Sequence, residues 1–180
     1  PWSLSGGGAR ELTELLHSTS KGRLHDIAES IGFVATTRED DAYILGSAWR
    51  YLSPSGELIS ELVEGVCVRD WHLRRGQSII FPYAGNDLHS HVNEKIRRRL
   101  WSFRRNLAER RALSGTNEER GLAWTDYSDF SRNRFRSNFL ITFSYVSTHS
   151  NFTLSRTSKI FIRTAPVIKL PEKATEDEHL

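Results

Sequence analysis

The sequence predicts a single mixed α/β domain. Short strand-like runs separated by polar turns alternate with one long amphipathic helical pattern, and no internal repeat interrupts them. The length of 180 residues suits one domain, and 38% hydrophobic residues with 11% aromatic residues are enough to form a core. The sequence has no run of 18 apolar residues and no signal peptide. Its single cysteine, Cys67, excludes an internal disulfide, so we expect a reducing, cytoplasmic setting and no membrane partner.

The first 90 residues predict one helix followed by short strands. Ala9, Leu12, Leu15 and Leu16 share a helical face, and Gly22 marks the expected end of this helix. The glycines at 6–8 are interpreted as a flexible lead-in. Predicted strands are the short apolar runs 24–28, 42–45, 58–63, 66–68 and 78–81. The polar segments 36–41 and 53–56 are predicted turns between them.

The clearest predicted helix covers residues 90–113. Its narrow apolar stripe consists of Ile96, Leu100, Phe103 and Leu107. Its other side carries Arg97, Arg98, Arg104 and Arg105. Ser90 is the expected N-cap, and Gly115 lies just past the expected end. The stripe predicts packing on a sheet, whereas the arginines fit either a solvated face or contact with phosphates.

Residues 121–136 interleave aromatic side chains with arginines, and two interpretations are open. Such residues can clamp phosphates and stack on bases, or they can form an aromatic lid over a hydrophobic core. Further strands are predicted at 139–147 and 159–163, around the polar turn at 149–151, and at 166–170, where Pro171 ends the run.

Charge is unevenly distributed along the chain. Residues 97–136 contain 11 arginines against five carboxylates, whereas residues 1–96 contain nine basic against 13 acidic side chains. A basic block is the electrostatic footprint of a phosphate-binding surface. The competing interpretation is a solvated face in a chain that simply favours arginine, since arginine outnumbers lysine 20 to five.

We expect the chain to be a segment of a longer protein, because it begins at Pro1-Trp2 and contains no methionine. Residues 1–171 are the predicted domain, and residues 172–180 are an acidic tail or the start of a further segment.

No common catalytic constellation is present. His89 and His91 have metal-like spacing but lack a further ligand, and no Gly-x-Ser-x-Gly motif occurs. The carboxylates beside Lys95 and Lys173 do not fit a magnesium-dependent nuclease, so that function is disfavoured. We therefore predict no catalytic residue and no metal in this chain, which is not expected to be an enzyme by itself.

Several sequence blocks resemble a known family. GLAWTDYSDF at 121–130, YVSTHSNFTL at 145–154, KIF at 159–161 and TAPVIKLP at 164–171 resemble the region that follows the catalytic domain in large adenine-specific DNA methyltransferases. These are single-chain, type IIG-like restriction-modification enzymes and related phage-exclusion enzymes. The segments LHDIA at 24–28, DAYIL at 41–45 and VEGVCVRDW at 63–71 resemble a TaqI-like target-recognition domain.

The resemblance implies a twisted, largely antiparallel sheet that carries loops, with the 90–113 helix packed on it. It implies sequence-specific recognition of double-stranded DNA for an adenine methyltransferase of a restriction-modification or phage-defence system. The methylation motif Asn/Asp-Pro-Pro-Tyr/Phe and the glycine-rich S-adenosylmethionine turn are absent from this chain. The cofactor and catalysis are therefore expected in a separate domain, which would also be a partner of this one.

For the phosphate contacts we predict two groups of arginines, Arg97, Arg98, Arg104 and Arg105 from the helix, and Arg132 and Arg134 after it. For reading base edges we predict residues in turns, namely Thr37, Arg38, Arg74, Arg75, His149 and Asn151. The alternative function is a protein-interaction module that docks on the methyltransferase domain or on a partner subunit, in which case the arginine helix would be covered by protein.

Overall fold

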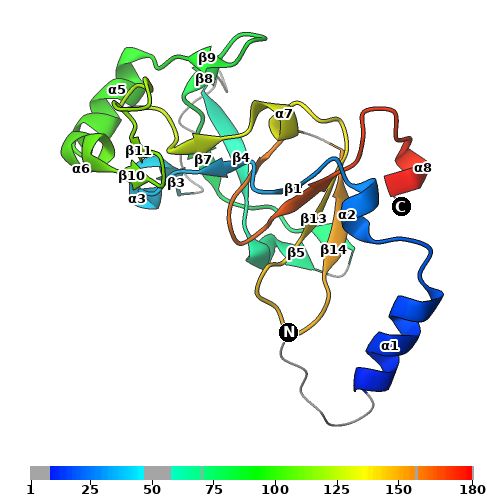
Figure 1. Cartoon of the computed structure of the whole chain (residues 1–180). Helices are drawn as coiled ribbons and strands as arrows, with labels where there is room; N and C mark the ends of the chain where they lie inside the picture. The colour runs from blue at the N-terminus through cyan, green and yellow to red at the C-terminus, as the bar shows by residue number, and fades with distance from the viewer. Residues whose placement is uncertain (1–8, 47–57, 70, 157, 180) are drawn as a thin grey trace.

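Two four-stranded sheets and four two-stranded ribbons organise the described residues of the computed structural model, which are 9–46, 58–69, 71–156 and 158–179 (Figure 1). The first sheet is antiparallel and has the order β1 (Ser30–Gly32), β16 (Val167–Lys169), β13 (Leu140–Phe143) and β14 (Phe152–Ser155). The second has the order β15 (Ile160–Phe161), β4 (Ile59–Val63), β7 (Ser78–Ile80) and β3 (Ile44–Leu45). Its β15–β4 pair is parallel and its other pairs are antiparallel. The predicted mixed, largely antiparallel α/β class is confirmed.

The ribbons and helices complete the chain between these sheets. The ribbons pair β2 (Ala35–Thr36) with β12 (Asp129–Phe130), β5 (Val68–Arg69) with β6 (His72–Leu73), β8 (Tyr83–Ala84) with β9 (His89–Ser90), and β10 (Arg111–Ala112) with β11 (Gly115–Thr116). The helices are α1 (Ala9–Thr19), α2 (Leu24–Ile27), α3 (Asp40–Tyr43), the 3₁₀-helix η1 (Gly65–Cys67), α5 (Glu94–Trp101), α6 (Arg104–Glu109), α7 (Arg132–Phe135) and α8 (Glu176–His179).

One buried apolar cluster connects the two sheets and the arginine-rich helices. It contains Leu140 of the first sheet, Leu62 and Ile79 of the second, and Leu100 and Leu107 of α5 and α6. Each such side chain contributes about 1.5–3 kcal/mol when it leaves water. The helices that carry the arginines are therefore fixed to the sheets from their apolar side.

The predicted single helix at 90–113 is wrong in its extent, although its apolar stripe is correct. Ser90 belongs to β9, and the N-cap is Asn93, whose side chain accepts a hydrogen bond from the Ile96 backbone N–H at 2.9 Å. The helix ends at Trp101, and a second helix starts at Arg104. The helix axis changes direction at the break around Phe103, and Leu100 of α5 and Leu107 of α6 are both fully buried.

Local pairing also changes several predicted strands. Residues 24–27 form α2, where Asp26 accepts a hydrogen bond from the Arg23 backbone N–H, and Asp40–Tyr43 forms α3 rather than the start of a strand. The segment 66–68 is largely the 3₁₀-helix η1. β13 ends at Phe143 and forms a hairpin with β14, so the turn covers 144–151, whereas the sequence predicted a strand up to residue 147. The glycines at 6–8 and the turn at 53–56 lie outside the described residues.

The aromatic residues of 121–136 lie in the core or pack against it, so the lid interpretation applies to them. Tyr127 is buried and donates its hydroxyl to the Ile80 carbonyl at 2.5 Å. Phe130 stacks on Tyr83 with ring centroids 4.4 Å apart. Burial raises the pKa of Tyr127 well above its usual value and raises the pKa of Tyr43 to about 12. These rings are therefore packing elements and not free stacking platforms.

Arg110 is a buried cation that connects three segments of the chain. Its guanidinium donates to the carbonyls of Leu107 at 3.0 Å, Thr37 at 2.5 Å and Asp126 at 2.7 Å, and also to the carbonyl of Trp124. It also lies over the Tyr43 ring, at 5.5 Å from the centroid. The turn after β2, the end of α6 and the loop before Tyr127 are thus held by one side chain.

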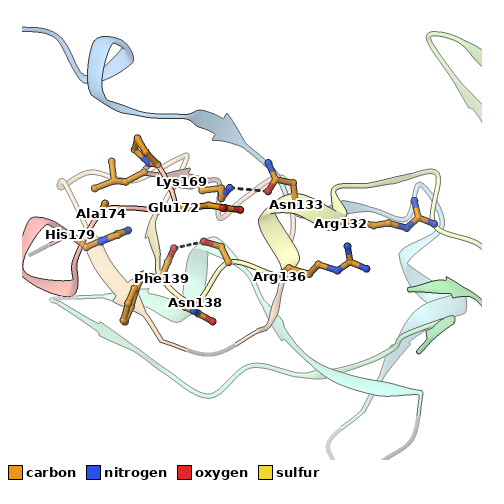
Figure 2. Close-up of a pocket in the computed structure, with 12 residues that line it drawn as sticks. Arg132, Asn133, Arg136, Asn138, Phe139, Lys169, Glu172, Ala174 and His179 are labelled. Carbon is orange, nitrogen blue, oxygen red and sulfur yellow. Dashed lines mark hydrogen bonds between the residues drawn. The ribbon is translucent and has the colours of Figure 1, made fainter. Parts of the chain in front are cut away.

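A second buried cation, Lys169, connects β16 with the start of β1 and with α7. Its ammonium is 2.7 Å and 2.8 Å from the two carboxylate oxygens of Glu29 and 2.8 Å from Asn133 Oδ1. The bond to Asn133 is drawn in Figure 2. Residues after 171 fold back on the body, where His179 is buried with its ring 5.3 Å from that of Phe139.

Replacing Arg110 by alanine should strongly destabilise the fold, because several buried carbonyls lose their donor together. We expect the free energy of unfolding to fall by about 3 kcal/mol or more in urea titrations. The matched control, Arg97→Ala, removes an exposed arginine and should change it by no more than about 0.5 kcal/mol. Equal effects of the two substitutions would contradict the role given to Arg110.

Glu29 should make stability depend on pH. Hydrogen bonds from Lys169 and then from Asn133 lower the pKa of Glu29 below its usual 4.5. A carboxyl group whose folded pKa is depressed stabilises the protein above its unfolded pKa, and this contribution is lost as the pH falls through the folded pKa. We therefore expect Glu29→Gln to destabilise most above pH 4.5, with a difference from the wild type that shrinks at lower pH. A difference independent of pH in urea titrations would refute this electrostatic account.

Candidate nucleic-acid interface

A groove lined by arginines runs beside residues 33–38. It consists of two adjoining hollows of about 710 and 410 Å³, which share Phe33, Ala35, Thr36, Arg38 and Arg163. The arginines of its lining come from four separate parts of the sequence and are Arg38, Arg120, Arg134 and Arg163. Asp40 and Asp129 are the carboxylates of the same lining, so the groove has an excess of positive charge. We call it the arginine groove.

Arg38 is held at the groove by a turn that is fixed from the inside. The Thr37 hydroxyl bonds to Asp40, and the Thr37 carbonyl accepts a hydrogen bond from Arg110. Arg38 itself has φ +58°, a left-handed conformation that costs energy in a residue other than glycine. Its nearest carboxylate oxygen, on Asp129, is 3.9 Å away, which is a weak exposed pair. The backbone of Arg38 is therefore constrained, while its guanidinium remains available to a ligand.

Arg120 also lines the groove and contacts Asp129, the same carboxylate that lies near Arg38. Its guanidinium donates to the Ser128 carbonyl at 2.5 Å and to Asp129 Oδ1 at 3.0 Å. The β2–β12 pairing places Asp129 opposite Thr36, which brings this pair beside Arg38. Asp129 therefore neutralises Arg120 first and Arg38 only partly.

Arg134 lines the groove but is already engaged by the protein. It donates to Ser30 Oγ at 3.2 Å and to the carbonyls of Phe33 at 2.9 Å and Ile31 at 3.3 Å. Its guanidinium lies 3.0 Å from the place where a Cβ at Gly32 would be. Burial lowers the pKa of Arg134. Arg134 therefore fixes the loop between β1 and β2 with three of its five donors, and its contact with a phosphate stays a prediction.

The other side of the groove carries Tyr145 and Arg163, which are both exposed. The Tyr145 backbone N–H donates to the Thr164 carbonyl at 3.0 Å, and Gly65 N–H donates to Thr164 Oγ1 at 3.0 Å. A Cβ at Gly65 would lie 2.4 Å from the Thr164 carbonyl oxygen, so this close approach requires glycine. Within the part of the chain that the structure describes, the Arg163 guanidinium has no hydrogen bond or ion pair.

The predicted helix arginines are all exposed, but half of them are paired. Arg98 contacts Glu94 at 2.9 Å, and Arg105 contacts Glu109 at 3.0 Å. Such exposed pairs contribute little and can reopen in favour of a phosphate. Arg104 lies over the Trp101 ring, at 4.7 Å from its centroid. Together with Arg97, these residues keep a cationic surface on α5 and α6, and their contact with phosphates stays a prediction.

Arg132 of α7 and Arg136, the C-cap of that helix, line a further hollow of about 650 Å³. Figure 2 shows both side chains extending away from Lys169 and Glu172. Arg132 donates to the Leu88 carbonyl at 3.3 Å, and Arg136 donates to the Asn86 carbonyl, so both tie α7 to the β8–β9 hairpin. Arg132 remains exposed and keeps donors for an anion.

The predicted base-reading residues divide into exposed and buried sets. Arg38, Arg74, Arg75 and His149 are exposed. Thr37 is 1% exposed, and Asn151 is 7% exposed. The Asn151 amide donates to Ser147 Oγ at 2.8 Å and to the His149 carbonyl at 3.3 Å, which closes the 144–151 turn. Thr37 and Asn151 thus shape turns, whereas the exposed set is free to face a ligand.

Sequence reasoning did not select Arg120, Arg163 or Tyr145 as site residues. Arg120 and Arg163 stand outside the densest arginine runs, and only the β2–β12 and β15–β4 pairings bring their segments to the groove. Tyr145 belongs to the block YVSTHSNFTL at 145–154, which resembles the methyltransferase family but does not by itself point to a groove. The sequence does indicate the 144–151 turn, because polar residues there separate two apolar runs. It does not indicate that this turn lies beside Arg163.

Among the described residues, no group of three or more His, Cys, Asp and Glu side chains could hold a metal ion. His89 contacts Asp87 at 2.9 Å, and its ring centroid is 6.2 Å from that of His91. No helix in the described ranges has both the length and the apolar character needed to cross a membrane.

Comparison with known proteins places this chain beside parts of much larger ones. No family model matches it. It is 32% identical, over its whole length, to the adenine-specific methyltransferase PglX of Streptomyces coelicolor, of which it spans 15%. A structure of the Type IIL restriction-modification enzyme MmeI in complex with DNA aligns with 87% of this chain and 20% of that one. The TM-score is 0.56 at 10% identity, which shows a shared fold. The chain is thus similar in sequence to a stretch of PglX and shares the fold of a part of MmeI.

Proposed function

We propose that this chain recognises the DNA target of an adenine-specific DNA methyltransferase in a restriction-modification or phage-defence system. The observation that carries the proposal is the arginine groove, whose Arg38 and Arg163 keep most of their hydrogen-bonding capacity free. Arginine is the side chain best suited to bidentate contacts with phosphates and with guanine. The DNA named with the MmeI structure supports the same class of ligand.

Methylation itself is assigned to another part of the longer protein. The chain lacks the methylation motif, and Phe81-Pro82-Tyr83, which comes nearest to it, does not fit that role. Tyr83 is 5% exposed, stacks on Phe130 and accepts a hydrogen bond from the Tyr127 backbone N–H through its hydroxyl. S-adenosylmethionine and the reacting adenine would therefore be held by the remainder of the methyltransferase, beyond residues 1–171.

Phosphate binding and base reading would fall to different groups. Arg163, Arg132 and the exposed arginines of α5 and α6 would hold phosphates and set the register on the duplex. Arg38, whose backbone is fixed by the turn after β2, would read a base edge together with the 144–151 turn. The TaqI-like assignment of this recognition region belongs to the same proposal.

The double substitution Arg38→Ala plus Arg163→Ala should weaken binding of this chain to a random-sequence duplex. Each phosphate contact that is lost should reduce the slope of log K against log salt concentration by about 0.9. Fluorescence anisotropy at several salt concentrations measures both quantities. Arg104→Ala plus Arg105→Ala, tested in parallel, determines whether α6 also contributes.

The matched control is Arg156→Ala, because Arg156 is exposed, is paired with Glu176 at 2.5 Å and does not line the groove. It should leave both affinity and salt slope unchanged. If the groove variant binds as tightly as the wild type at every salt concentration, the arginine groove is not the DNA contact. If the wild type binds no duplex even at low salt, the isolated chain lacks the proposed activity.

A second candidate function, docking on the rest of the methyltransferase, is favoured by α1. Leu12, Leu15 and Leu16 form its apolar face and are each more than half exposed. Figure 1 shows α1 standing apart from the sheets at one side of the molecule. The occupant we assign is the methyltransferase portion of the same longer protein, since the chain spans only 15% of its relative PglX. This role is compatible with DNA recognition on the groove.

Docking of α1 predicts slower amide hydrogen exchange of residues 9–19 in the full-length methyltransferase than in this chain alone. Leu12→Ser plus Leu16→Ser should restore fast exchange in the full-length protein, because the apolar face can no longer be buried. Leu113→Ser, on the exposed turn between β10 and β11, is the control. Identical exchange of α1 in both proteins would exclude docking through this helix.

A further inference from the structure

Trp71 is an exposed aromatic residue in a constrained position that neither the core nor the groove explains. It lies between β5 and β6, and the residue is 82% exposed. Its φ of +67° is left-handed, which suits glycine or asparagine and strains a bulky residue. A tryptophan that is both strained and solvated contributes little to folding, so its presence at this turn indicates a contact with a ligand.

The backbone beneath Trp71 is fixed. Its carbonyl accepts a hydrogen bond at 3.0 Å from Oγ1 of Thr153, a buried residue of β14. Arg69 donates to the carbonyls of Gly65 at 2.7 Å and Val68 at 2.6 Å, which stiffens the base of the ribbon. The indole is therefore displayed on a firm support, as required of a side chain that must enter a stack without folding back.

The same ribbon is joined to the wall of the arginine groove. Gly65, at the start of the η1–β5 segment, bonds to Thr164 Oγ1 at 3.0 Å, and its carbonyl accepts a hydrogen bond from Ser144 Oγ at 3.1 Å. Thr164 and Tyr145, which follows Ser144, line the groove itself. The loops that line the groove and the ribbon that carries Trp71 are thus joined by hydrogen bonds. A duplex bound along the groove would contact this same set of connected loops.

The charge around Trp71 favours a nucleic acid as its ligand. Residues 69–75 contain three arginines and one histidine against a single carboxylate. Arg74 and Arg75 are exposed. An exposed aromatic ring with arginines close to it in the sequence is the combination that can stack on a base while the arginines hold adjacent phosphates.

We propose that Trp71 is a wedge that inserts its indole into the base stack of the bound duplex. This inference rests on the proposed DNA recognition. Methyltransferases must take the target base out of the stack, and an apolar side chain that fills or opens a step lowers the cost of that distortion. The indole would stack most readily where the duplex already has a gap, such as a position that lacks a base.

The test compares two random-sequence duplexes, one intact and one with a central abasic position, in binding to the 180-residue chain. The wild type should prefer the abasic duplex, because the indole can occupy the gap. Trp71→Gly should remove this preference, a loss of roughly fivefold or more in relative affinity, and Trp71→Phe should keep part of it. Trp101→Ala, which removes another exposed tryptophan, is the matched control and should keep the preference.

Thermal unfolding separates a stacking role from a structural one. Glycine accepts φ +67° without strain, so Trp71→Gly should leave the melting temperature unchanged or raise it. A wild type that binds duplex with a steep salt dependence but shows the same duplex preference as Trp71→Gly overturns the wedge alone. A wild type that binds no duplex overturns the proposed function and the wedge together. Loss of docking to the rest of the methyltransferase without any change on DNA would instead assign Trp71 to a protein interface.

Discussion

The buried guanidinium of Arg110 is the interaction on which the described fold most depends. It satisfies carbonyls from the turn after β2, from the end of α6 and from the loop before Tyr127, which are separated by up to 89 positions in the sequence. No hydrophobic residue could replace it without leaving those carbonyls unpaired in a low-dielectric interior. Arg110 donates a hydrogen bond to the Thr37 carbonyl, so it also determines the position of the neighbouring exposed Arg38.

Arginines in this protein perform two physically different tasks. Arg110, Arg134 and Arg120 spend their donors on backbone carbonyls and hold loops, whereas Arg38 and Arg163 are left at the surface of the groove. A guanidinium has five donors in a fixed fork, which makes it equally suited to binding carbonyls from several loops and to binding a phosphate. An arginine count along the sequence therefore measures both tasks together, and only the pattern of burial separates them.

The fold class followed from the sequence, and the details of the site did not. The apolar stripe at Ile96, Leu100 and Leu107 was correct because helical periodicity is a local property. The break between α5 and α6, and the short helices at 24–27 and 40–43, depend on caps and tertiary packing that periodicity does not encode. Arg38 could be selected from its polar turn. Arg163, which lines the same groove, could not be selected from the sequence, because it comes near Arg38 only through the pairing of distant strands.

The most direct test of the account is a hydrogen-exchange map of this chain, with and without a random-sequence DNA duplex at low salt. DNA recognition through the arginine groove predicts slower exchange at 33–38, 144–151 and 162–164, with little change in α1. Slower exchange confined to α1 and α2, or none at the groove while the duplex is bound, would contradict it. The map reports exchange along the chain in a single experiment, so it locates the interface without relying on any one substitution.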